Sequence, residues 1–181
     1  MRNFLIVLLI LVLGAVGLVY RRVQNEPADF KYTQTRMIEA SCESVYNQLN
    51  DFKRWELWSP WVAKDPLIKF YYGGASAGVG ATQSWHSSKS GSVEQSLTSL
   101  TPNSVVEYSF HMSELGSASA GRFTLTESPT KQCDVEWTIW GSRTTRERVL
   151  MVLLQMEAKM LEDLAVGLQR IEQLIKAPPT S

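Results

Sequence analysis

Residues 144–176 read TTRERVLMVLLQMEAKMLEDLAVGLQRIEQLIK, and this segment restricts which fold the rest of the chain can adopt. Thr144 and Glu147 have the spacing of a capping box, and no proline or turn cluster interrupts the residues that follow. We therefore expect one helix over Arg146–Lys176, about 45 Å long at about 1.5 Å per residue and ended by Pro178-Pro179. Apolar side chains recur along it at helical spacing and form one stripe: Val149, Val152, Leu153, Met156, Met160, Leu164, Leu168, Ile171 and Leu174.

The region before this helix consists of short alternating runs separated by turn residues, which indicates an antiparallel sheet. We expect strands over residues 30–40, 67–72, 79–86, 92–100, 105–112, 121–126 and 132–140. Alternation makes one face of this sheet apolar and the other solvated, so the apolar face needs a cover. A sheet of this kind is roughly 30 Å wide, at about 4.8 Å per strand, and the long helix can cross it. A coiled-coil dimerisation helix is the alternative, but it would leave the apolar face uncovered.

Between the first two predicted strands the sequence indicates helical structure rich in tryptophan. Ser41 is a plausible N-cap for a helix that ends near Asn50, with apolar residues on one face. Residues 52–61 contain Trp55, Trp58 and Trp61 together with Pro60, which makes them too irregular for a strand and interrupts a helix.

The N-terminal residues Phe4 to Tyr20 form an unbroken apolar run, FLIVLLILVLGAVGLVY. At about 1.5 Å per residue the run spans roughly 26 Å, slightly less than a typical hydrocarbon core. We expect a single-pass transmembrane anchor over residues 1–22, a linker over 23–29, the folded domain over 30–176 and a tail over 177–181. A cleaved signal peptide is the alternative, although no small-x-small cleavage site follows directly.

The charged residues beside the anchor leave its orientation open. Arg2 and the amino terminus favour one side of the membrane, whereas Arg21, Arg22 and Lys31 favour the other, and the counts nearly balance. In an oxidising compartment the two cysteines, Cys42 and Cys133, could pair, but the sequence does not place them close enough to decide.

Composition excludes several classes of function. The chain of 181 residues has 18 basic and 18 acidic residues, and a net charge of zero argues against a nucleic-acid partner. Two cysteines exclude a disulfide-dense scaffold and a four-thiolate metal site, and two histidines leave little material for a multi-histidine centre. We therefore expect no metal and no cofactor.

A set of motifs lies between about Phe30 and Lys176: Asp51-Phe52-Lys53-Arg54-Trp55, Trp58-Ser59-Pro60-Trp61, Asp65-Pro66, Gly78-x-Gly80-Ala81 with Trp85, Val106-Glu107-Tyr108, Thr138-x-Trp140-Gly141 and Met160…Asp163-Leu164…Gly167-Leu168. On these motifs the sequence resembles the START-like (SRPBCC) superfamily, in particular polyketide cyclase/dehydrase-type members related to the birch pollen allergen. This resemblance implies an α+β helix-grip fold, in which a curved seven-stranded antiparallel sheet wraps the long C-terminal helix around a hydrophobic cavity. Members bind lipids, sterols, polyketides or other apolar molecules, and some are enzymes, so the fold does not fix the function.

Large side chains on the predicted inner surface are the candidates for binding a hydrophobic small molecule or lipid. Rings on a curved sheet either line a pocket or fill a closed core, and both interpretations stay open here. Methionines on the covering helix can adapt the shape of such a pocket. The candidate ligand-binding residues are Trp58, Trp61, Trp85, Tyr108, Phe110, Phe123, Trp137, Met156 and Met160.

Catalysis is the alternative to binding, and it needs a reactive group inside the cavity. A serine hydrolase would need a nucleophile on a sharp elbow, which we do not expect here. A cyclase or dehydratase needs an acid or base on the inner face, where Gln83 is the one polar candidate and does not titrate. Glu94, Asp134 or Glu136 would have to turn inward. A third interpretation, a protein-interaction scaffold, predicts an exposed apolar patch near Trp55–Trp61.

Overall fold

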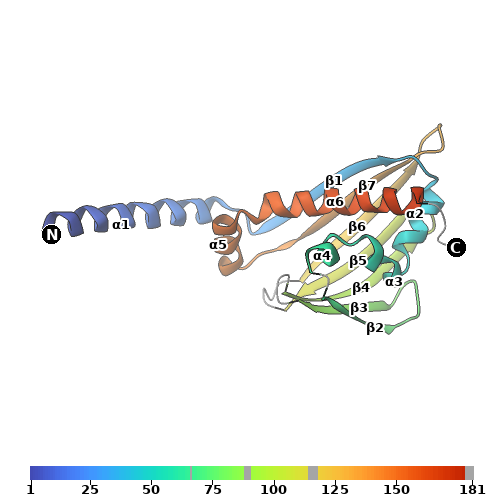
Figure 1. The fold of residues 1–181 in the computed structure, drawn as a ribbon, viewed down its shortest axis with the longest axis horizontal. Helices are drawn as coiled ribbons and strands as arrows, with labels where there is room; N and C mark the ends of the chain where they lie inside the picture. Colours follow the sequence, from blue (N-terminus) through green and yellow to red (C-terminus); the bar gives the residue numbers. More distant parts are fainter. Residues whose placement is uncertain (66, 88–90, 114–117, 178–181) are drawn as a thin grey trace.

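The computed structural model describes residues 1–65, 67–87, 91–113 and 118–177. Pro66 and the predicted helix-ending pair Pro178-Pro179 lie outside the described residues. Figure 1 shows a long N-terminal helix projecting from a domain in which a sheet curves around one C-terminal helix. The elements are α1 (Arg2–Asn25), β1 (Asp29–Ile38), α2 (Cys42–Leu49), α3 (Phe52–Trp58), α4 (Pro60–Lys64), β2 (Lys69–Gly74), β3 (Ala81–Ser87), β4 (Gly91–Thr101), β5 (Val105–Met112), β6 (Ala118–Glu127), β7 (Cys133–Ser142), α5 (Thr145–Leu154) and α6 (Met156–Lys176).

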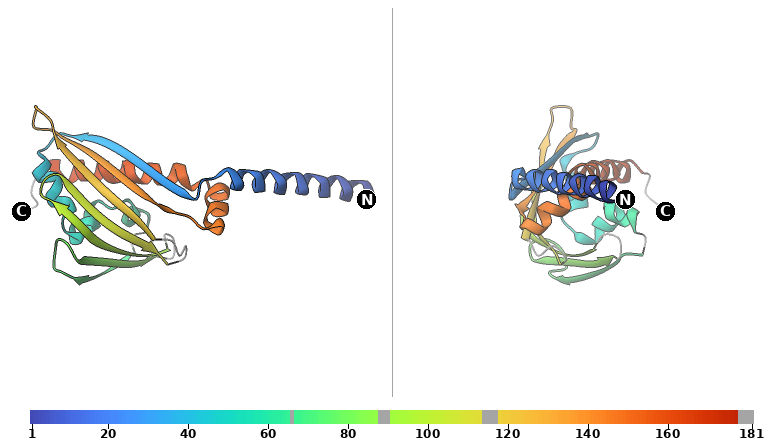
Figure 2. Two further views of the ribbon diagram at one scale, coloured as in Figure 1. Left: turned by 180° about the vertical axis from the view of Figure 1, so that it is seen from behind. Right: turned by 90° about the vertical axis from the view of Figure 1, so that its left-hand side faces the viewer.

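The predicted α+β helix-grip architecture is confirmed. The seven strands form one sheet in the order β1-β7-β6-β5-β4-β3-β2, and each neighbouring pair is antiparallel. β1 therefore lies beside the last strand of the chain, where Tyr32 pairs with Ile139. The two views of Figure 2 show the sheet bending around α6. The short helices α2, α3 and α4 lie beside α6 on the same concave face and contact it.

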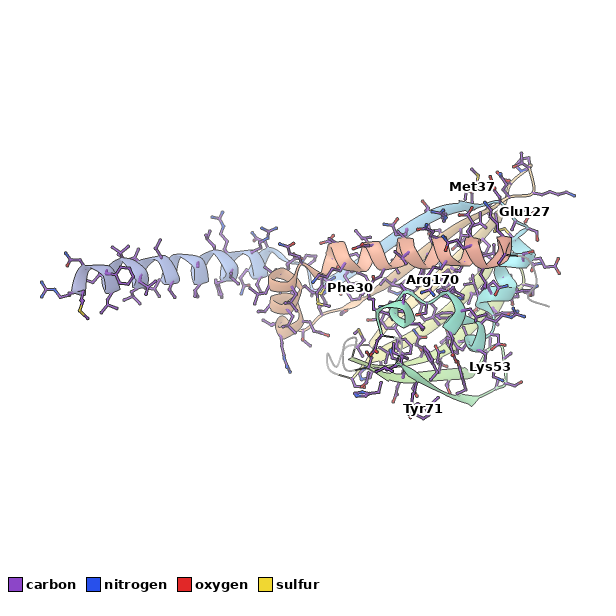
Figure 3. The ribbon with its side chains drawn as sticks, in the orientation of Figure 1. Phe30, Met37, Lys53, Tyr71, Glu127 and Arg170 are labelled. Atoms are coloured by element: carbon purple, nitrogen blue, oxygen red, sulfur yellow. A yellow bond between two sulfur atoms is a disulfide. The ribbon has the colours of Figure 1, made fainter. Side chains whose placement is uncertain are left out.

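α6 lies on the concave face because its buried residues follow one helical stripe. Leu164, Leu168 and Ile171 are each at most 1% exposed. Gly167 permits the closest approach, since a Cβ built there would lie 2.7 Å from the Trp137 ring. Farther along, Arg170 donates to the carbonyl oxygen of Ser59 at 2.9 Å and so joins α6 to the end of α3 (Figure 3).

The prediction of one uninterrupted helix over Arg146–Lys176 is wrong. The helix breaks at Gln155, whose φ of 50° is left-handed, and the chain changes direction there. The capping box formed by Thr144 and Glu147 is present but begins α5, a separate helix that contacts both α1 and α6. The reason is length: the 21 residues of α6 extend about 32 Å, which already crosses the sheet. Leu153 and Leu154 of α5 are therefore more than half exposed, whereas Met151 still packs against the hydrophobic core.

α1 continues to Asn25, beyond the predicted anchor and into the predicted linker. Among the described residues it is the one helix long and apolar enough to cross a membrane, and its apolar side chains are exposed. Val23, near its end, is 4% exposed and belongs to the contact with the rest of the protein.

The short helices between β1 and β2 are held by caps and by indole hydrogen bonds. The Ser41 side chain accepts from the backbone nitrogen of Ser44, which confirms the predicted N-cap of α2. Trp55 donates its Nε1 proton to the carbonyl of Leu49 at 2.9 Å, and Trp58 donates to the carbonyl of Gln48 at 3.1 Å. Both tryptophans therefore fasten α3 against the end of α2.

The two cysteines form a disulfide that joins the start of α2 to the start of β7. Their Cα atoms are 4.9 Å apart, and both residues are buried. A hydrogen bond lies next to the disulfide: the backbone N–H of Cys42 donates to the Glu127 carboxylate at 2.8 Å.

Glu172 is expected to stabilise the domain in a pH-dependent way. It pairs with Lys176 at 2.9 Å and with Arg36 of β1 at 2.6 Å, and hydrogen bonds from these two groups hold the pKa of Glu172 below its ordinary value. A lowered folded-state pKa adds stability above the ordinary carboxyl pKa, and this stability is lost as the pH falls through the folded-state value. Glu172→Gln should therefore cost up to about 1 kcal/mol at neutral pH and almost nothing in acid.

Urea unfolding followed by tryptophan fluorescence at several pH values measures this difference. Glu162→Gln is the control, because Glu162 lies exposed on the same helix. A cost for Glu172→Gln that persists unchanged in acid would contradict the proposed ion-pair origin.

Candidate functional site

One end of the concave surface is a solid cluster of rings, which we call the aromatic cluster: Trp55, Trp58, Tyr108, Phe123 and Trp137. Each of these residues is at most 2% exposed. The ring centroids of Phe123 and Trp137 are 4.6 Å apart, and those of Trp55 and Tyr108 are 5.0 Å apart. Trp137 Nε1 donates to Tyr108 Oη at 2.9 Å, and burial raises the pKa of Tyr108 above its usual value. The cluster is therefore a closed, neutral core.

The other end of the concave surface contains a mostly enclosed cavity of about 50 Å³, which we call the sheet–helix cavity. Trp61 of α4 and Trp85 of β3 stack across it with centroids 6.1 Å apart, and Met160 of α6 closes it from the helix side. Its lining residues are Trp61, Trp85, Val93, Gln95, Phe110, Met112, Ile139 and Met160.

The structure divides the candidate ligand-binding residues into two groups. Trp61, Trp85, Phe110 and Met160 meet at the sheet–helix cavity. Trp58, Tyr108, Phe123 and Trp137 belong to the aromatic cluster and pack against one another. Met156 is the first residue of α6 and does not line this cavity. A ligand-binding role for any of them stays a prediction.

Sequence reasoning missed other residues of the wall, above all Gln95. Gln83 was expected to be the one polar side chain on the inner face, but Gln95 also lies there and is 5% exposed. The alternation Val93-x-Gln95-x-Leu97 carried this signal, since all three residues are buried. Gln83 itself donates to the carbonyl of Phe52 at 3.2 Å.

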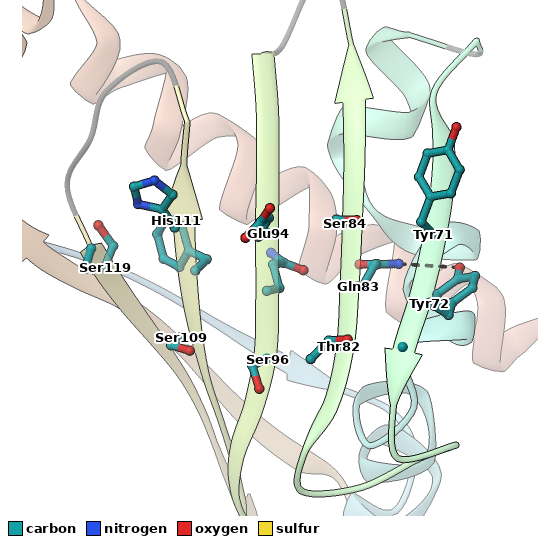
Figure 4. Close-up of a pocket in the computed structure, with 14 residues that line it drawn as sticks. Tyr71, Tyr72, Thr82, Gln83, Ser84, Glu94, Ser96, Ser109, His111 and Ser119 are labelled. Carbon is teal, nitrogen blue, oxygen red and sulfur yellow. Dashed lines mark hydrogen bonds between the residues drawn. The ribbon is translucent and has the colours of Figure 1, made fainter.

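A larger hollow of about 520 Å³ lies on the opposite face of the sheet and is open to solvent. Figure 4 shows its polar floor, in which Glu94 and His111 occupy paired positions on β4 and β5. At its edge, Tyr72 donates to the Glu56 carboxylate, and burial together with this hydrogen bond raises the pKa of Tyr72. Gln95 and Phe110 line both this hollow and the sheet–helix cavity.

The acidic residues that the enzyme interpretation needed do not face the cavity. Glu94, Asp134 and Glu136 are all exposed on the outer face, as alternation predicts. The buried carboxylate of Asp65 accepts from Ser87 Oγ at 2.6 Å, and that of Asp163 pairs with Lys64. No group of three or more metal-ligating side chains occurs within the described residues.

The sequence contains one Gly-x-Ser-x-Gly pattern, although a nucleophile elbow was not expected. Residues 74–78, GASAG, match the Gly-x-Ser-x-Gly pattern of a nucleophile elbow. The structure places them in the connection between β2 and β3, with Gly74 and Gly78 at positive φ. A nucleophile elbow joins a strand to a helix, so the match lacks the required structural context.

The scaffold interpretation predicted an exposed apolar patch near Trp55–Trp61, and it stays a prediction: Leu57 in this segment is 54% exposed, but two of the three tryptophans are buried. Trp55 and Trp58 are 2% and 0% exposed, and Trp61 faces the sheet–helix cavity.

Comparison with known proteins agrees with this architecture. Residues 29–176 match the model of the family described as polyketide cyclase / dehydrase and lipid transport. No protein of curated function matches the sequence.

Solved structures share the fold at low sequence identity. A Mesorhizobium loti protein is 19% identical with a TM-score of 0.59, over 81% of this chain and 96% of its own. Norcoclaurine synthase from Thalictrum flavum is 14% identical with a TM-score of 0.59, over 83% and 95%. Aha1 from Colwellia psychrerythraea is 20% identical with a TM-score of 0.55, over 83% and 99%. The family match confirms the resemblance found in the sequence, and the solved structures share the helix-grip fold: the chain belongs to the polyketide cyclase/dehydrase and lipid transport family.

Proposed function

We propose that this protein is a membrane-anchored binding module that holds a hydrophobic small molecule or lipid in the sheet–helix cavity. The observation that carries the proposal is the mostly enclosed, largely apolar space between Trp61, Trp85 and Met160, in a family whose description includes lipid transport. The described residues that line the cavity include no acid, base or metal ligand, which favours binding over catalysis.

The energy of binding would come from burial of apolar surface. At roughly 25 cal/mol per Å², removing about 200 Å² of ligand surface from water is worth about 5 kcal/mol before the costs of association. The cavity is small, but Met112 and Met160 in its wall are flexible side chains that can change rotamer around a guest.

The anchor and the disulfide support a location for the domain. We propose that α1 spans a membrane and that the domain lies on the oxidising side of it. Disulfides persist in oxidising compartments, and Cys42 is bonded to Cys133. The positive charges flanking α1 nearly balance, so the disulfide is the stronger argument. A lipidic ligand would then have its source in the adjacent bilayer.

Filling the cavity should abolish binding. Val93→Phe adds a ring to the cavity wall, and we expect at least a tenfold loss of affinity for an apolar probe, measured by quenching or enhancement of tryptophan fluorescence in the full-length protein in lipid nanodiscs. Trp61 and Trp85 provide the signal.

Val79→Phe is the matched control, since Val79 is 56% exposed and does not line the cavity. Thermal unfolding of both variants verifies that the domain is folded. Equal affinity of the Val93→Phe variant and the wild type would refute binding at this site, and native mass spectrometry that never detects a bound apolar molecule would count against the function itself.

A further inference from the structure

Two residues that line the sheet–helix cavity each carry a buried side-chain polar atom without a hydrogen-bond partner among the described residues. They are the indole nitrogen Nε1 of Trp85 and the amide oxygen Oε1 of Gln95. The two residues are 6% and 5% exposed, and both line the same cavity. The other buried side-chain atom of this kind, Nε of Arg148, belongs to α5 and not to the cavity wall.

Such atoms are rare in folded proteins because a buried donor or acceptor that loses water without gaining a partner destabilises the native state. Two of them in one cavity point to a partner that the protein does not itself provide. The atoms left without a partner are one donor, the Trp85 N–H, and one acceptor, the Gln95 side-chain carbonyl oxygen.

The positions of the two residues allow one small group to reach both. In the register of β3 and β4, Trp85 pairs with Val93 and Gln83 pairs with Gln95, so Trp85 and Gln95 are diagonal neighbours on the same face. Diagonal neighbours are about 7–8 Å apart, a separation that long side chains can bridge through a single shared atom.

The chemistry of the pair selects among ligand groups. A hydroxyl both accepts and donates, so it satisfies the Trp85 N–H and the Gln95 oxygen with one atom. A carboxylate only accepts, so it would leave the Gln95 oxygen without a donor. An ammonium only donates, so it would leave the Trp85 N–H without an acceptor. No charged side chain lines the cavity within the described residues, which further disfavours an ionised ligand.

We propose that the ligand of the sheet–helix cavity is a neutral apolar alcohol, whose hydroxyl donates to Gln95 Oε1 and accepts from Trp85 Nε1 while its hydrocarbon part contacts the remaining wall. This inference rests on the proposed function, because it names the class of molecule that the same cavity binds. The apolar part of the wall is formed by Trp61, Val93, Phe110, Met112, Ile139 and Met160.

The test compares two probes of nearly equal shape, cyclohexanol and methylcyclohexane, in which a methyl group replaces the hydroxyl. Binding to the full-length protein in nanodiscs is measured by tryptophan fluorescence as a function of the free aqueous concentration of each probe, which corrects for partition into the lipid. Because the hydrocarbon leaves water more readily than the alcohol, each affinity is divided by the water-to-alkane partition coefficient of its probe, and on this scale we expect the alcohol to bind at least tenfold more tightly than the hydrocarbon.

Two variants remove the polar partners separately. Gln95→Met removes the acceptor at nearly constant volume, and Trp85→Phe removes the indole donor. Each should reduce the affinity for cyclohexanol about tenfold and leave the affinity for methylcyclohexane the same or higher. Gln83→Met is the matched control, because Gln83 is buried on the same face but does not line the cavity and already donates to Phe52. It should retain the preference for the alcohol.

The outcomes separate the two proposals. If neither probe binds the wild type, the proposed function fails together with this inference. If both probes bind equally well, the cavity is a general apolar site, the two polar atoms interact with water only, and the alcohol proposal is overturned while the function stands. A preference for the alcohol that survives in Trp85→Phe also overturns it, and this variant decides the matter if Gln95→Met does not fold.

Discussion

Loss of the disulfide, by the double substitution of Cys42→Ala and Cys133→Ala, is expected to lower the free energy of unfolding by about 4 kcal/mol, the largest effect that the structure predicts for a change outside the cavity. The bond closes a loop with a sequence separation of 91, which includes the short helices and most of the sheet. In the chain-entropy model, a loop of this length restricts the unfolded chain by about 4–5 kcal/mol.

The native state should change little in that variant. Both cysteines are buried, at 2% and 0% exposure, and alanine removes only a sulfur atom from each position. The loss therefore reflects chiefly the freed unfolded chain. For a domain of this size it corresponds to a fall of roughly 10 °C in the midpoint of thermal unfolding.

Thermal and urea unfolding of the full-length protein, with and without reductant, measures this effect. The reduced wild type should match the double variant, which serves as its control. Alkylation with a maleimide polymer, after membranes are dissolved in denaturant to expose the buried cysteines, tests the pairing directly, since no cysteine should react before reduction. Reaction without reductant would contradict both the disulfide and the proposed location on the oxidising side.

Gly121→Ala is expected to destabilise the domain by about 3 kcal/mol, because a Cβ at this position meets a ring that cannot move. The added atom would lie 2.2–2.4 Å from three ring and hydroxyl atoms of Tyr108. Tyr108 is held by its hydrogen bond from Trp137 at 2.9 Å and by the edge of Trp55, with centroids 5.0 Å apart. Tyr108 therefore cannot move away from the new Cβ without displacing other rings of the aromatic cluster.

Urea unfolding of Gly121→Ala alone and together with Tyr108→Leu distinguishes a steric effect from a backbone effect. The double variant should be destabilised by less than the sum of the two single variants, because leucine leaves space for the new Cβ. Gly17→Ala is the control, since a Cβ at Gly17 has no neighbour within 4 Å. Strict additivity of the two substitutions would show that Tyr108 is not the obstacle.

The strands and the N-terminal helix could be predicted because their patterns are local. Residues 105–112 were expected to form a strand with Tyr108 facing inward, and they form β5 with Tyr108 at 2% exposure. Ser41 was expected to cap a helix, and its side chain does so. Both patterns depend on neighbours a few positions away, so they need no knowledge of the tertiary structure.

The extent of the C-terminal helix was not predictable in this way. The apolar stripe continues through residues 149–156, but Gln155 is left-handed and separates α5 from α6. Only the width of the sheet determines how many turns can pack against it, and that width follows from the pairing of strands far apart in the sequence.

By itself, the sequence determined which residues face inward, where the caps stand, that seven strands precede a covering helix, and which family the chain resembles. The tertiary structure alone decided which inward rings close into a solid core and which surround a space, and that Cys42 meets Cys133. It also decided that Trp85 and Gln95 line one cavity, each with a buried polar atom that has no hydrogen-bond partner among the described residues. The physical reason is that periodicity specifies the direction of a side chain, whereas volume and hydrogen-bond partners depend on residues brought together from distant parts of the chain.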